Sequence, residues 1–168
     1  MRRPFRRGPA PPADALARLD RDERVLAWGT TVDDSAVLAT PLGLWWTEGE
    51  RLPWHLITHV SWSGTTLTVT SATEVEPSVL ENEPARSVRL AESGTLPETV
   101  QTRFYSSRSR TTRHRLPGGS GVVIVARRIP GQDGLTWHAV YDEPAQRHEP
   151  DSREEVARLL DAARAPRS

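Results

Sequence analysis

Short apolar runs separated by turn residues dominate residues 24–70 of the chain. Apolar and polar positions alternate within the runs, and Asp-Asp, Pro, Glu-Gly-Glu or Ser-Gly separates one run from the next. Hairpins spaced this closely are typical of a small antiparallel sheet or barrel. The pattern therefore predicts a mainly β architecture, with strands at 24–30, 36–40, 43–47, 51–62 and 65–70.

The pattern changes in the second half of the chain. Alternation fades after residue 70, and we expect an irregular, partly helical insertion around 72–106. Within it, a helix is predicted to begin after Thr95, because Thr95 and Glu98 fit a capping box. Further on, the β-branched run 122–127 and the alternating run 135–141 predict a second hairpin.

The C-terminal residues predict an amphipathic helix. Asp151 and Glu154 fit a second capping box at its start. Apolar side chains then recur at helical spacing, and such a stripe must be buried against another element. They are Val156, Leu159, Leu160 and Ala163. We expect this helix to plug one mouth of the barrel.

Sequential hairpins followed by one amphipathic helix resemble the order of a pleckstrin-homology-like (PH-like) barrel. A Leu-x-Thr strand at 38–40 precedes a Trp-x-x-Ile-x-x-Val strand formed by Trp54, Ile57 and Val60. Over about 20–165 the chain resembles uncharacterised PH-like and GRAM-like domain proteins of actinobacteria. The resemblance implies an α+β fold, an antiparallel β-barrel or roll capped by the C-terminal helix. It also implies a binding or scaffold role, since PH-like barrels are rarely enzymes.

Composition sets the expected domain organisation. With 168 residues and no cysteine, we expect one domain over 13–165, without disulfides, thiolate zinc sites or cysteine nucleophiles. Residues 1–12 hold four arginines and four prolines and predict a flexible basic arm, and 166–168 form a tail. No run approaches the ~18 apolar residues of a membrane span, and no apolar region follows the N-terminal arginines. A cytoplasmic protein without a transmembrane segment is therefore expected.

No catalytic constellation is evident, so the chain is predicted not to be an enzyme and to use no cofactor or metal. His55 and His59 lie about 13 Å apart if the strand is straight, too far to share one zinc. Ser120 lies in a Gly-Ser-Gly turn and not at a nucleophile elbow. A hydrolase stays as an alternative that requires His138 or His114 to meet a carboxylate beside a cleft.

The sharpest charged feature is a run of arginines between residues 103 and 115, interleaved with Ser and Thr. If it is extended, Arg108 and Arg110 share a face with His114. Such a ribbon can grip phosphates of nucleic acid or an anionic surface, aided by the N-terminal arm. A solvated sheet edge is the competing interpretation, because edge charges block aggregation. The candidate residues are Arg103, Arg108, Arg110, Arg113 and Arg115.

Tryptophans provide the other candidate surface. Trp45 and Trp46 are adjacent, so in a strand they point to opposite faces, and one of them is an interface anchor unless a neighbouring element covers it. The leading hypothesis is accordingly a non-catalytic module that binds a protein partner, and an open sheet edge also allows a homodimer. The loop at 31–35 carries Asp33 and Asp34, which argues against phosphoinositide binding by the usual PH route.

Overall fold

The structure is a computed structural model that describes residues 10–166. Within these residues, eleven strands form one continuous sheet in the order β4-β3-β2-β1-β8-β6-β7-β11-β10-β9, with β5 paired to β6 off this path. The strands are β1 (Ala27–Thr31), β2 (Ala36–Ala39), β3 (Gly43–Trp45), β4 (Arg51–Pro53), β5 (Ile57–Ser63), β6 (Thr66–Glu76), β7 (Val79–Asn82), β8 (Arg86–Glu92), β9 (Arg108–Arg115), β10 (Gly121–Arg127) and β11 (Thr136–Tyr141). The helices are α1 (Ala13–Leu16), α2 (Leu96–Ser107) and α3 (Pro150–Arg164), with 3-10 turns η1 (Trp54–Leu56) and η2 (Pro144–His148).

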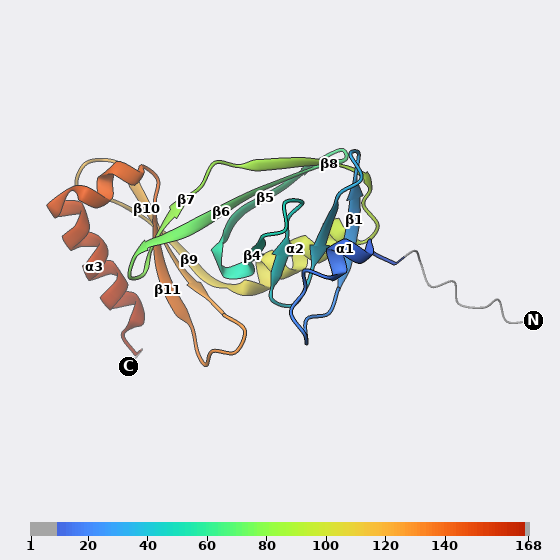
Figure 1. The fold of residues 1–168 in the computed structure, drawn as a ribbon. Helices are drawn as coiled ribbons and strands as arrows, with labels where there is room; N and C mark the ends of the chain where they lie inside the picture. Colours follow the sequence, from blue (N-terminus) through green and yellow to red (C-terminus); the bar gives the residue numbers. More distant parts are fainter. Residues whose placement is uncertain (1–9, 167–168) are drawn as a thin grey trace, which may run out of the picture.

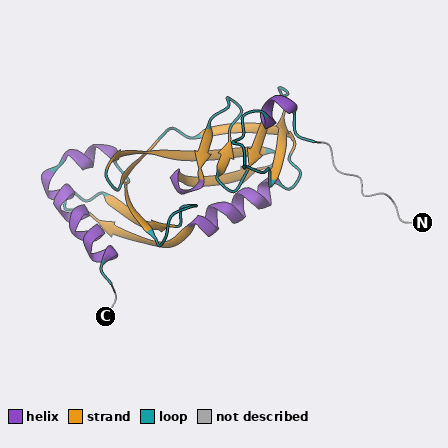
Figure 2. Cartoon of the chain, turned by 60° about the horizontal axis from the view of Figure 1, so that its bottom comes forward, coloured by secondary structure: helices purple, strands orange, loops and turns teal. Residues whose placement is uncertain are grey.

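The sheet has two parts, each covered by its own helix (Figures 1 and 2). We call β1–β5, the first part of β6, β8 and α2 the α2 side. We call β7, β9–β11, η2 and α3 the α3 side. The long strand β6 joins them, because Thr66–Val69 pair with β8 and Ala72–Glu76 pair with β7.

The α2 side is closed around one hydrophobic cluster. Strands β1 to β4 form an antiparallel meander, and β5, β6 and β8 continue it. From α2, Leu96, Val100 and Phe104 are buried in the cluster together with Leu67 of β6. These three helical positions follow one another at i, i+4 and i+8, so they lie on one face of α2.

The α3 side is a second layered unit. Strands β9, β10 and β11 form an antiparallel sheet, and β11 also pairs with β7 in parallel. Helix α3 buries Val156, Leu159 and Leu160 against Ile124 of β10 and other residues of one sheet face. Figure 1 places α3 at the opposite end of the molecule from α1 and β1.

The structure confirms a mainly β fold with a C-terminal helix, and it corrects how that helix packs. Val156, Leu159 and Leu160 were predicted to plug one mouth of a barrel, and in the structure α3 instead packs on one face of β10 and β11. Helix α2 covers the first hairpins instead. The stretch 72–106, predicted as an irregular, partly helical insertion, does contain the helix α2, but the rest of it is the end of β6, β7 and β8 and not irregular.

The predicted start of α2 is correct and that of α3 lies two residues too late, and the capping boxes do not form. Thr95 precedes α2 without a side-chain capping bond. Glu149, and not Asp151, occupies the position before α3. The arm predicted at 1–12 lies mostly outside the described residues. None of the helices among residues 10–166 is both long and apolar enough to cross a bilayer.

Candidate functional site

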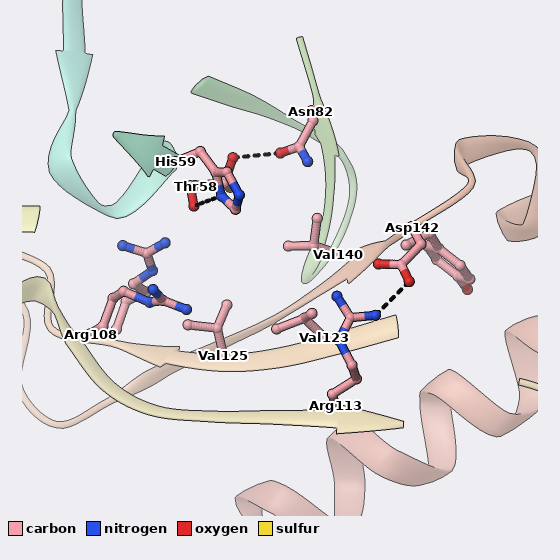
Figure 3. A pocket seen from close by; sticks show the side chains of 11 residues that line it. Thr58, His59, Asn82, Arg108, Arg113, Val123, Val125, Val140 and Asp142 are labelled. Atoms are coloured by element: carbon pink, nitrogen blue, oxygen red, sulfur yellow. Dashed lines mark hydrogen bonds and ion pairs between the residues drawn. The ribbon is translucent and has the colours of Figure 1, made fainter. Parts of the chain in front are cut away.

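A cavity of about 380 Å³ lies on the face of the β9–β10–β11 sheet that α3 does not cover. Residues from β5 and β7 form its opposite wall (Figure 3). This volume falls within the roughly 300–1,000 Å³ typical of small-molecule sites. The cavity therefore occupies the junction between the two sides of the molecule.

Valines form the floor of this cavity. Val123 and Val125 of β10 alternate with Val122 and Ile124, which face α3. Val140 of β11 lies opposite Val123 in the antiparallel ladder, so it shares the same face. We call Val123, Val125 and Val140 the valine floor.

A β-bulge brings Arg108 to the same cavity. Thr111 pairs with Val125 and Arg110 with Ala126, but the register then shifts and Arg108 pairs with Arg127. The shift leaves Ser109 as an extra residue in β9, which reverses the alternation beyond it. Arg108 therefore lines the cavity, while Arg110 lies on the opposite face.

Arg127 lies at the base of the cavity and is only 1% exposed. Its guanidinium donates hydrogen bonds to the carbonyl oxygen of Ile57 at 2.8 Å, to Ser107 Oγ at 3.0 Å and to the carbonyl oxygen of Trp54 at 3.4 Å. Its Nε is buried without a partner. No carboxylate within the described residues lies at ion-pair distance from this buried cation.

Arg108 and Arg127 form an arginine pair. Their guanidinium carbons lie 5.3 and 5.8 Å from the centre of the Phe104 ring. Arg108 donates to Thr111 Oγ1 at 3.1 Å, and its Nε is also buried without a partner. Burial and, to a smaller extent, the charge of Arg108 lower the pKa of Arg127 to about 10. Arg127 is therefore cationic at neutral pH, which leaves uncompensated positive charge at this end of the cavity.

The other end of the cavity is neutralised internally. Arg113 of β9 donates to Asp142 at 2.6 Å, as Figure 3 shows. Gly121 makes room for this ion pair, because a Cβ there would lie 2.5 Å from Asp142 Oδ2 and 2.8 Å from Arg113 Nη1. The two ends of the valine floor thus differ in net charge.

A polar wall faces the valine floor. Thr58 donates to Asn82 Oδ1 at 2.7 Å, which ties the beginning of β5 to the end of β7. His59 Nδ1 lies 2.8 Å from the carbonyl oxygen of Thr58 (Figure 3). These side chains offer hydrogen bonds to a molecule above the valine floor.

The structure separates the arginines that the sequence grouped. Arg108 and Arg113 line the cavity, whereas Arg110 lines a groove beside α3. Arg115 is exposed at the end of β9, and Arg103 lies on α2 beside a different hollow. The prediction that Arg108 shares a face with Arg110 and His114 was wrong because of the bulge at Ser109.

Neither candidate tryptophan offers its ring to a partner. Trp46 is 3% exposed and belongs to the cluster under α2. Trp45 packs against Ala15 and Leu19 of the N-terminal segment and donates to Glu23 at 3.0 Å. The neighbouring element therefore covers the outward tryptophan, which removes both as interface anchors.

His138 and His114 are the histidines on which the hydrolase alternative depends. His138 Nε2 lies at ion-pair distance from Glu74 Oε2, 3.7 Å, but neither residue lines the cavity. His114 contacts Thr112 at 3.0 Å and no carboxylate. No cluster of three or more His, Asp or Glu side chains among the described residues is arranged to hold a metal ion.

Sequence reasoning missed Arg127, Asn82 and Asp142. A signal for Arg127 was present, because it continues the buried run Val-Val-Ile-Val-Ala, where a charge is unexpected. Asn82 and Asp142 carry no such signal, because Asn82 ends a strand and Asp142 follows one, where polar residues are ordinary.

Comparisons of the chain with protein-family models, curated proteins and solved structures find no match.

Proposed function

We propose that this protein is a non-catalytic binding module that holds a negatively charged group at the arginine pair. The observation that carries the proposal is Arg127, a buried cation that has an unpartnered Nε and no carboxylate partner among residues 10–166. Buried charges in proteins are ordinarily paired, because leaving one uncompensated costs several kcal/mol. A bound anion would supply the missing partner.

Phosphate and carboxylate are the groups that suit this site. A guanidinium presents its donors in a planar fork that matches their oxygens, and charge-assisted bonds of this kind are about twice as strong as neutral ones. Arg108 and Arg127 both retain an unpartnered Nε–H. An anion between them would also relieve the repulsion that helps to lower the pKa of Arg127.

The PH-like resemblance and the protein-partner hypothesis both bear on this proposal. We propose that the α2 side is a PH-like unit in which α2, following the hairpins, takes the capping position. Its support is the antiparallel meander followed by a helix buried against it. The protein-partner hypothesis loses support because Trp45 and Trp46 are buried, and anion binding is favoured over it.

The test is titration calorimetry of the protein with methyl phosphate and acetate at low salt. We expect saturable binding at one site. Arg108→Gln should weaken it about 10- to 100-fold, since a hydrogen bond to a charged group contributes about 1.5–3 kcal/mol.

Arg115→Gln is the matched control, because it removes the same charge from the same strand outside the cavity. It should leave binding almost unchanged. Equal losses in both variants would mean that general charge, and not the cavity, attracts the anion. Absence of binding by the unaltered protein would overturn the proposal.

A further inference from the structure

We infer that the ligand is an amphiphilic organic anion with one charged end, whose apolar body lies along the valine floor. The inference rests on the proposed function and adds the chemical class of the ligand. It depends on the length of the cavity, the apolar floor and the different charge of the two ends.

The cavity is longer than a small anion. Arg127 marks one end and Val123, opposite Arg113, marks the other. These positions are four residues apart on β10, which corresponds to about 13 Å along a strand. In Figure 3, Arg108, Val125, Val123 and the Arg113–Asp142 pair follow one another in this order. A water molecule takes up only ~30 Å³ in the liquid, so an inorganic anion would leave most of a 380 Å³ cavity unfilled.

The floor between the two ends is apolar. Val123 and Val140 lie directly opposite each other, and Val125 continues the row toward Arg127. Val123 is partly buried and offers most of the open apolar surface, while Val125 and Val140 are 2% and 9% exposed because they also pack against Ala72 and Leu80. Apolar surface that a ligand covers in such a row contributes to affinity in proportion to its area.

Only one end of the cavity carries uncompensated charge. Asp142 neutralises Arg113, and Gly121 preserves the room for that pair. Arg108 and Arg127 have no such partner among the described residues. A ligand with a single anionic head therefore fits better than one charged at both ends.

The distribution of arginines disfavours a nucleic acid as the ligand. A strand of nucleic acid needs a continuous track of cations for successive phosphates. Arg108 and Arg113 face the cavity, but Arg110 between them faces α3. The basic strand is thus divided between two faces of the sheet.

The test is a chain-length series of alkyl phosphates, from methyl through butyl and hexyl to octyl, each below its micelle concentration. A buried methylene contributes about 0.8 kcal/mol, so each added carbon should tighten binding about fourfold until the floor is covered. A parallel series of alkyl carboxylates distinguishes the two head groups. The neutral alcohol 1-octanol should bind much more weakly than octyl phosphate.

A floor variant separates the apolar contribution from that of the charge. Val123→Thr places a hydroxyl under the chain and should weaken octyl phosphate about tenfold, a much larger loss than for methyl phosphate. The same substitution at the 62%-exposed Val32 is the control and should change neither.

The outcomes distinguish the two proposals. Methyl phosphate binding with no gain along the series would overturn the amphiphilic ligand and leave the anion site standing. A chain-length gain that persists undiminished in Val123→Thr would also overturn it, because the chain would then lie elsewhere. No binding of any alkyl phosphate or carboxylate would overturn the anion site itself.

Discussion

The α2 side and the α3 side treat their buried polar groups differently. On the α2 side, Trp54 Nε1 donates to the carbonyl oxygen of Thr40 at 2.8 Å and Trp45 Nε1 donates to Glu23, and Trp62 Nε1 is the exception. On the α3 side, buried nitrogens of Arg108, Arg127 and His138 have no partner.

This difference indicates that the two sides have separate roles, one in stability and one in binding. A side whose polar groups are mostly satisfied internally has little left to offer a ligand, and its cluster under α2 serves stability. Unsatisfied buried groups call for an explanation, and the binding of an ion is one of the standard explanations. The α3 side therefore contributes the arginines of the proposed binding site, and the α2 side contributes its opposite wall and a stable scaffold.

The largest expected effect is a loss of stability from truncating the α2-side cluster. Leu67 is fully buried between β5 and β8, so Leu67→Ala should lower the free energy of unfolding by about 2–5 kcal/mol. Urea unfolding measures this change. The variant, where folded, should bind methyl phosphate like the unaltered protein. A large loss of affinity in the folded variant would mean that the two sides are not separable.

A pair of glycine substitutions sharpens the comparison. At Gly43, a Cβ would lie 2.5 Å from the backbone oxygen of Leu52, so Gly43→Ala should cost about 1–3 kcal/mol. At Gly121 the nearest atoms are the side-chain ends of Asp142 and Arg113, which can move.

Gly121→Ala should therefore cost less than about 1 kcal/mol, yet displace the ion pair at the cavity end and change octyl phosphate affinity. Thermal unfolding and titration of both variants provide the measurement. The reverse pattern, with stability lost at Gly121 and affinity lost at Gly43, would contradict the separate roles of the two sides.

The smallest expected effect is a loss of stability at acidic pH. Burial lowers the pKa of His138 and of His55, whose rings stack 6.5 Å apart. Glu74 partly opposes the shift of His138, and Arg127 and Arg164 add to it. Just below the ordinary pKa of 6.5 the unfolded chain then binds more protons than the native protein. The free energy of unfolding should accordingly fall as the pH drops below 6.5.

His138→Gln should reduce this acid sensitivity, as followed by urea unfolding at pH 7.5, 6.5 and 5.5. An unchanged pH profile in the variant would show that His138 does not titrate differently in the folded protein.

The sequence is a good guide to the strands and helices, because local patterns largely determine them. Helix α2, the β10–β11 hairpin and the amphipathic face of α3 all follow from periodicity. The packing of α3 does not follow, since an apolar stripe specifies that it must be buried but not against which sheet. The strand β7 was also not predicted, because its pairing with β11 involves residues about 60 positions later in the chain.

The candidate site was only half visible in the sequence. Arg108 and Arg113 stand out because they belong to a charged run, but strict alternation puts Arg108 on the wrong face. A single extra residue, Ser109, changes that face, and no local pattern marks the bulge. Arg127 belongs to the site because it pairs with Arg108 between β10 and β9, and such pairing is not visible in the local sequence.

The parallel contact between β7 and β11 constrains the order in which the chain acquires its structure. Every residue that packs in the cluster under α2 precedes β9 in the chain, so this cluster can form without the later strands. The cavity must wait for Ala139 and Val140 to reach Val79 and Leu80, a long loop closure that slows folding. A chain that ends before residue 136 would thus contain the cluster under α2 but lack β11, which completes the cavity.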